Sequence, residues 1–125
     1  NNYPNINFQY GDIRRIESTE LFDGVLLAYS LFHIEKNQIP EVLDGVDRVL
    51  KPDGRIFLAL QEGEGEVFAD EPMLPGEKIY LSLLSEAEIR SILDTHFKII
   101  SFDRKTSSLT GELPYNKMMI IAELK

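Results

Sequence analysis

Apolar runs without alternation mark the strands that this chain is predicted to form. Val25-Leu-Leu-Ala28 is the first of them, and an unbroken apolar run is typical of a parallel strand with both faces covered. Residues 55–60, 97–102 and 118–124 predict three more strands. Residues 6–10 alternate between apolar and polar side chains, which predicts a strand with one better-covered face.

Two segments have the spacing of helices. After Asn37, apolar residues recur every three or four positions and form one stripe of a helix; they are Ile39, Val42, Leu43, Val46, Val49 and Leu50. The turn Lys51-Pro-Asp-Gly54 ends this helix. Ser85-Glu-Ala-Glu88 has the spacing of a capping box and predicts a second helix over residues 85–95.

The order of these elements is strand, strand, helix, strand, helix, strand, strand. Such alternation predicts an α/β fold with a largely parallel sheet and right-handed crossovers. Because no helix is predicted between the last two strands, we expect them to form an antiparallel hairpin at one edge of the sheet.

Residues 61–76 are predicted to form a long loop. This segment holds five acidic residues, three glycines, two prolines and no lysine or arginine. A loop of this length in a compact domain is often a functional lid, and its charge would favour a cationic or amine substrate. The alternative is a solvated loop that only keeps the protein soluble.

Charge and composition argue against several classes of binding partner and site. The 125 residues carry a formal net charge of −8, which disfavours binding to phosphate backbones and to anionic membranes. Cysteine is absent, so disulfides, thiolate nucleophiles and thiolate metal sites are excluded. No apolar run approaches the ~20 residues that span a bilayer. We therefore expect a soluble, cytoplasmic protein that binds neither nucleic acid nor membranes.

Three segments, in this order and spacing, resemble the C-terminal portion of class I S-adenosylmethionine-dependent methyltransferases. They are Phe8-Gln-Tyr-Gly-Asp12, Phe22-Asp-Gly-Val with Leu31-Phe-His-Ile34, and Val46-Asp-Arg-Val-Leu-Lys-Pro-Asp-Gly-Arg-Ile56. The resemblance implies an incomplete three-layer Rossmann-like sheet with a C-terminal antiparallel hairpin. Residues 1–125 would form a single partial domain, from the third strand of the family fold onward, without the glycine-rich turn of the cofactor site.

The resemblance also implies a set of site residues. Asp12 matches the position that accepts a hydrogen bond from the adenine amino group, and Ile13 the position that borders the ring. Ala28 and Tyr29 match the strand end that faces the methionine part and the transferred methyl group, and Tyr29 also borders the substrate. From the residues alone, capping a turn after Gly11 is the favoured role of Asp12, and Tyr29 can equally pack half-buried.

Two further residues are assigned to the acceptor side of the site. The segment around Tyr80 follows the acidic loop, where the resemblance implies a substrate-binding lid. His33 is the candidate general base, because histidine titrates near neutral pH; a structural histidine is the alternative. Methyl transfer to a good nucleophile depends mainly on alignment, so a base is not required.

The function that follows is methyl transfer from S-adenosylmethionine to an unidentified small-molecule acceptor. One alternative is half of a nicotinamide-dependent oxidoreductase, which would end in parallel strands. Another is a non-catalytic, methyltransferase-like interaction module. In the sheet that the resemblance implies, the strand 23–28 is flanked on one side by a first strand that this chain lacks, so that edge would be exposed. Such an edge favours pairing with another chain, and we therefore expect self-association through that edge or by exchange of residues 6–10.

Overall fold

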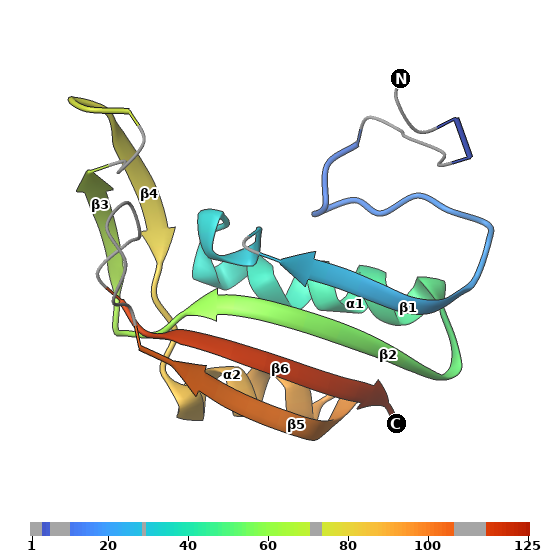
Figure 1. The fold of residues 1–125 in the computed structure, drawn as a ribbon. Coiled ribbons are helices and arrows are strands. Elements are labelled where there is room, and N and C mark those ends of the chain that lie inside the picture. Colours follow the sequence, from blue (N-terminus) through green and yellow to red (C-terminus); the bar gives the residue numbers. More distant parts are fainter. Residues whose placement is uncertain (1–3, 6–10, 29, 71–73, 107–114) are drawn as a thin grey trace.

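A four-stranded mixed sheet forms the centre of the fold (Figure 1). The structure is a computed structural model that describes residues 4–5, 11–28, 30–70, 74–106 and 115–125. The strands β1 (Phe22–Ala28), β2 (Leu50–Gln61), β5 (Phe97–Lys105) and β6 (Lys117–Leu124) lie in the order β1-β2-β6-β5. β1 is parallel to β2, whereas β6 is antiparallel to both β2 and β5. The predicted α/β fold with a C-terminal antiparallel hairpin is confirmed. The expectation of a largely parallel sheet is wrong for the described residues, because two of the three strand pairings in this sheet are antiparallel.

The helices of the described residues pack on one face of this sheet. Two 3-10 turns, η1 (Leu31–His33) and η2 (Lys36–Gln38), lead into α1 (Ile39–Val49), and α2 (Glu86–Asp94) precedes β5. Both helices share one apolar cluster with the strands, whose fully buried members include Val42, Leu43, Val46, Ile56, Leu58, Leu60, Ile89, Leu93, Met118, Ile120 and Ala122. The cross-strand pairs in this cluster, such as Leu58 with Ile120, share one face of the sheet. The described residues thus supply the sheet and one helical layer.

The opposite face of the sheet is partly open, and this corrects one expectation. We predicted that both faces of the strand containing Val25 would be covered. In this strand, β1, only Leu27 is buried, and the side chain of Leu26 is 66% exposed. The reason is that β1 lies at the edge of the sheet formed by the described strands and that α1 covers only the face to which Leu27 points.

The helix boundaries follow the predicted signals closely. Ser85 Oγ accepts a hydrogen bond from the Glu88 backbone N–H at 3.1 Å, and a Glu88 carboxylate oxygen accepts one from the Ser85 N–H at 3.0 Å. The predicted capping box is therefore formed. Leu50, which we assigned to the first helix, instead begins β2. Asp53 takes a positive φ of 63° within β2, where the pairing with β1 shifts from Phe22–Leu50 to Gly24–Arg55. Aspartate tolerates this conformation better than most residues.

The long loop predicted over residues 61–76 is wrong in one important respect. It contains a strand, β3 (Glu66–Asp70), which pairs antiparallel with β4 (Lys78–Ser82) in a separate two-stranded sheet. Val67 and Ala69 alternate with the exposed residues of β3 and pack on a second apolar cluster that includes the buried Phe32. Figure 1 shows this hairpin projecting from the end of the main sheet. The strand predicted over residues 6–10 lies outside the described residues.

Candidate functional site

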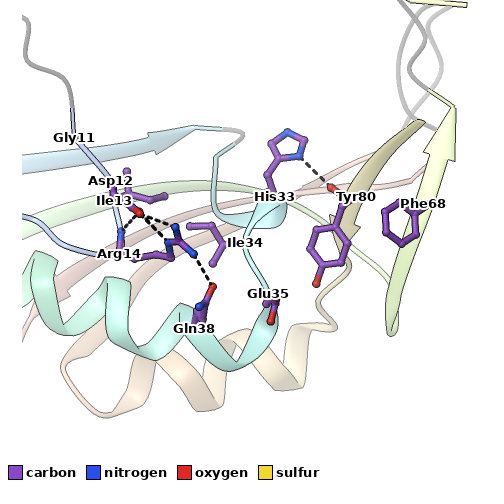
Figure 2. A pocket seen from close by; sticks show the side chains of 10 residues that line it. All are labelled: Gly11, Asp12, Ile13, Arg14, His33, Ile34, Glu35, Gln38, Phe68 and Tyr80. Atoms are coloured by element: carbon purple, nitrogen blue, oxygen red, sulfur yellow. Dashed lines mark hydrogen bonds and ion pairs between the residues drawn. The ribbon is translucent and has the colours of Figure 1, made fainter. Parts of the chain in front are cut away.

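An open cavity of about 840 Å³ lies beyond the carboxyl end of β1 (Figure 2). Its volume is near the upper end of the ~300–1,000 Å³ that is usual for ligand pockets. One wall is the segment 11–14, the floor is the connection through η1 and η2, and the other wall is the β3–β4 hairpin. The lining residues are Gly11, Asp12, Ile13, Arg14, His33, Ile34, Glu35, Gln38, Phe68 and Tyr80.

Asp12 is held in place by Arg14. One carboxylate oxygen accepts the Arg14 backbone N–H at 2.9 Å, and the other accepts Arg14 Nη2 at 2.6 Å, while Arg14 Nε lies 3.0 Å from both. The side-chain hydrogen bonds of Arg14, followed by the backbone bond, lower the pKa of Asp12 to about 2. The Asp12 carbonyl also accepts the Arg15 N–H at 2.8 Å. Asp12 therefore caps a turn and presents an ionised carboxylate to the cavity.

His33 has a hydrogen bond that fixes its tautomer. Its Nδ1 lies 3.2 Å from the backbone carbonyl oxygen of Tyr80, and a carbonyl oxygen can only accept a hydrogen bond. Nδ1 therefore carries the proton, so in the neutral ring Nε2 keeps its lone pair. The ring also lies 4.4 Å from the ring of Phe32, measured between centroids. This arrangement is compatible with a general base that acts through Nε2.

Tyr80 connects the hairpin to the floor of the cavity. Its hydroxyl lies 3.2 Å from Ser82 Oγ, and Ser82 in turn donates to the backbone carbonyl of Ile34. Burial raises the pKa of Tyr80, and a hydrogen bond with Glu66 adds to the rise. On the cavity side, the ring of Tyr80 meets that of Phe68 edge to face, with centroids 5.7 Å apart.

The structure brings together four of the residues predicted from the sequence. Asp12, Ile13, His33 and Tyr80 all line the cavity. Ala28 ends β1 but is not among the lining residues, and Tyr29 lies outside the described residues.

Sequence reasoning did not predict the six other lining residues as site residues: Gly11, Arg14, Ile34, Glu35, Gln38 and Phe68. An arginine two positions after Asp12, and a lone phenylalanine within an acidic segment, were available signals for two of them. Glu35 and Gln38 carry no such signal.

Comparison with known proteins shows which fold family this chain resembles. A sequence-family model described as a methyltransferase domain matches residues 1–54. An S-adenosylmethionine-dependent methyltransferase from Methanosarcina mazei superposes with a TM-score of 0.78 at 18% identity, covering 94% of this chain and 66% of that one. The fold is that of these methyltransferases. The resemblance seen in the sequence is thereby confirmed.

Two other structures with the methyltransferase fold were solved with S-adenosylhomocysteine. The Burkholderia thailandensis 1,6-didemethyltoxoflavin-N1-methyltransferase has a TM-score of 0.68 at 18% identity, covering 90% of this chain and 48% of that one. The N-methyltransferase NodS from Bradyrhizobium japonicum has a TM-score of 0.60 at 18% identity, with coverages of 91% and 52%. The chain thus spans about half to two thirds of the length of these methyltransferases. A comparison with curated proteins finds no match.

The residues matched by the methyltransferase family model include only some of the residues that line the cavity. Asp12, Ile13 and His33 fall within the matched residues 1–54, whereas Phe68 and Tyr80 lie beyond them. Within the described part of the chain, no helix has the length and apolar character needed to cross a bilayer.

Proposed function

We propose that this chain is the C-terminal part of an enzyme that transfers a methyl group from S-adenosylmethionine to a small-molecule acceptor. The observation that carries the proposal is the cavity in which Asp12 and Ile13 face His33 and Tyr80. The methyltransferase fold and the S-adenosylhomocysteine bound in similar structures support it. A cytoplasmic location is part of the same proposal.

The residues of the wall formed by segment 11–14 fit an adenine ring. The amino group of adenine donates hydrogen bonds, and the Asp12 carboxylate, ionised and half-exposed on the cavity, is an acceptor. Ile13 is partly buried and offers an apolar border for the ring. Because Arg14 already bonds both carboxylate oxygens, the amino group would share Asp12 with Arg14. Ala28 and Tyr29 would border the methyl group.

Methyl transfer at this site requires that the acceptor atom be aligned with the methyl group and the sulfur. An acceptor that loses a proton also needs a base to take it. When bound, the cofactor supplies a methyl group on a positively charged sulfur, which leaves with the electrons of the broken S–C bond. The cavity walls would hold the acceptor atom in line with that bond. His33 Nε2, whose lone pair is set by the Nδ1 hydrogen bond, would take the proton that the acceptor loses.

The antiparallel β5–β6 hairpin argues against half of a nicotinamide-dependent oxidoreductase. A non-catalytic module draws support from the Arg14–Asp12 pair, since both carboxylate oxygens already have partners. Calorimetric titration of S-adenosylhomocysteine into the full-length protein and into residues 1–125 separates these readings. Binding by the full-length protein supports the enzyme, and weaker binding by residues 1–125 supports a divided cofactor site. Absence of binding by either refutes the catalytic proposal.

Self-association through β1 is a further part of the proposal. Among the described strands, β1 has only β2 as a neighbour in the sheet, and the exposed Leu26 lies on β1. An exposed apolar edge strand offers unpaired N–H and C=O groups to a second copy. Light scattering on residues 1–125 should therefore report a species larger than a monomer, and a monodisperse monomer would contradict this part.

A further inference from the structure

One face of the β3–β4 hairpin packs on the protein, and the other carries two aromatic side chains. Because side chains alternate along a strand, Val67, Ala69, Ile79 and Leu81 share one face, and this face packs on Phe32 and Leu83. The other face carries Phe68 and Tyr80, which are cross-strand partners. The aromatic pair therefore lies opposite the face that holds the hairpin to the protein.

Phe68 is an aromatic side chain that belongs to neither apolar cluster of the described residues. It is 75% exposed, the highest value among the large exposed apolar residues of the described chain. Its ring is tilted by 63° to that of Tyr80, so the two rings form a corner at the cavity (Figure 2). Their centroids are 5.7 Å apart, so a cation in this corner could lie within about 6 Å of both, the range of cation–π attraction.

The charges around this corner are negative. Glu35 lines the cavity, and its side chain has no hydrogen bond or ion pair with the described residues. Glu35 and Glu66 both act on the Tyr80 hydroxyl and raise its pKa.

Within the described residues no cation forms an ion pair with Glu35 or Glu66, although the charge of Arg14 acts on Glu35 at longer range. Lys36 pairs with Glu88, at 3.0 Å, and Lys78 pairs with Asp70 on the hairpin itself. Arg14 is bonded to Asp12 on the opposite wall. Within the described residues, the corner therefore combines two aromatic rings with an unpaired carboxylate.

We propose that Phe68, Tyr80 and Glu35 form an acceptor subsite that binds an organic cation, namely a protonated or quaternary ammonium group of the methyl acceptor. The assignment as an acceptor subsite rests on the proposed function. A neutral aromatic acceptor would use the rings but would gain nothing from Glu35, whereas a cation gains from both. The negatively charged wall would also exclude anionic acceptors.

Calorimetry with choline and its neutral carbon isostere, dimethylbutanol, tests the subsite in the full-length protein saturated with S-adenosylhomocysteine. Choline should bind more tightly than dimethylbutanol. Phe68→Leu should weaken choline binding about fivefold, because it removes one aromatic face. Glu35→Gln should weaken it about two- to fivefold, as for an exposed ion pair, with little effect on dimethylbutanol. Glu20→Gln is the matched control, since it removes the same charge just before the amino-terminal end of β1.

Equal binding of the two probes, binding of neither, or unchanged choline affinity in both variants would overturn the subsite. These outcomes are distinct from failure of the proposed function, which is read from S-adenosylhomocysteine binding alone. A protein that binds S-adenosylhomocysteine but does not prefer choline keeps the function and loses the subsite. A protein that prefers choline in its cofactor-free form but does not bind S-adenosylhomocysteine keeps the cation site and loses the enzyme.

Discussion

Ser82 is the residue through which the hairpin wall can be loosened selectively. Its side chain is fully buried, donates a hydrogen bond to the Ile34 carbonyl and contacts the Tyr80 hydroxyl. Ser82→Ala removes both hydrogen bonds and leaves the Ile34 carbonyl without its side-chain donor. Leaving a buried polar group unsatisfied costs about 1–3 kcal/mol. Because the hairpin forms its own two-stranded sheet on a small apolar cluster, this cost should fall on local opening of the hairpin.

Native-state hydrogen exchange measures that opening directly. A loss of about 1–3 kcal/mol corresponds to exchange about 5- to 150-fold faster at the paired amides of β3 and β4. Amides of β2 and β6, which pair along seven residue positions, should change much less. Ser91→Ala, at an exposed position on α2, is the control. Unchanged exchange in β3 and β4, or equal acceleration throughout the main sheet, would refute the view that Ser82 anchors the hairpin.

Two predictions concern the titration of carboxylates. Arg14→Ala should raise the pKa of Asp12 from about 2 toward its usual 3.8, measured by carboxyl-carbon NMR; a pKa that stays near 2 would contradict the assigned cause. The pKa of Glu88 is lowered, chiefly by the hydrogen bond from the Ser85 N–H, so its contribution to stability is present above the usual 4.5 and is lost as pH falls through the lowered value. Urea unfolding between neutral pH and about pH 3 should show a smaller loss in Glu88→Gln, which keeps a capping residue; equal losses would refute this.

The elements that the sequence predicts correctly are those whose signals are local. The apolar stripe from Ile39 to Val49 and the Ser85 capping box each lie within a few turns of one helix, and both appear in the structure. The terminal hairpin was predicted because the sequence shows no helical pattern between residues 102 and 118. β3 was missed because Glu66, Ala69 and Asp70 are poor strand formers and lie in an acidic segment, and because the pairing with β4 that stabilises the strand is not visible in the segment itself.

For the cavity residues too, the predicted ones were found from signals in their own sequence segments, and those that depend on tertiary packing were not predicted. Asp12 and Ile13 were found because they belong to a segment that resembles a known family. Glu35 and Phe68 were not, since neither belongs to such a segment. Their meeting depends on how the hairpin folds back over the connection between β1 and α1. Tertiary packing, rather than local pattern, creates that wall.

This division predicts that the two walls of the cavity act independently. Asp12 contacts Arg14 and Arg15, whereas Phe68 contacts Tyr80, and the two share no contact partner in the described residues. Mutations without shared partners usually add within about 0.3–0.5 kcal/mol. Asp12→Ala should therefore weaken S-adenosylhomocysteine binding in calorimetry and leave choline binding unchanged, while Phe68→Leu should do the reverse. A coupling well above about 0.5 kcal/mol in the double variant would show instead that one wall positions the other.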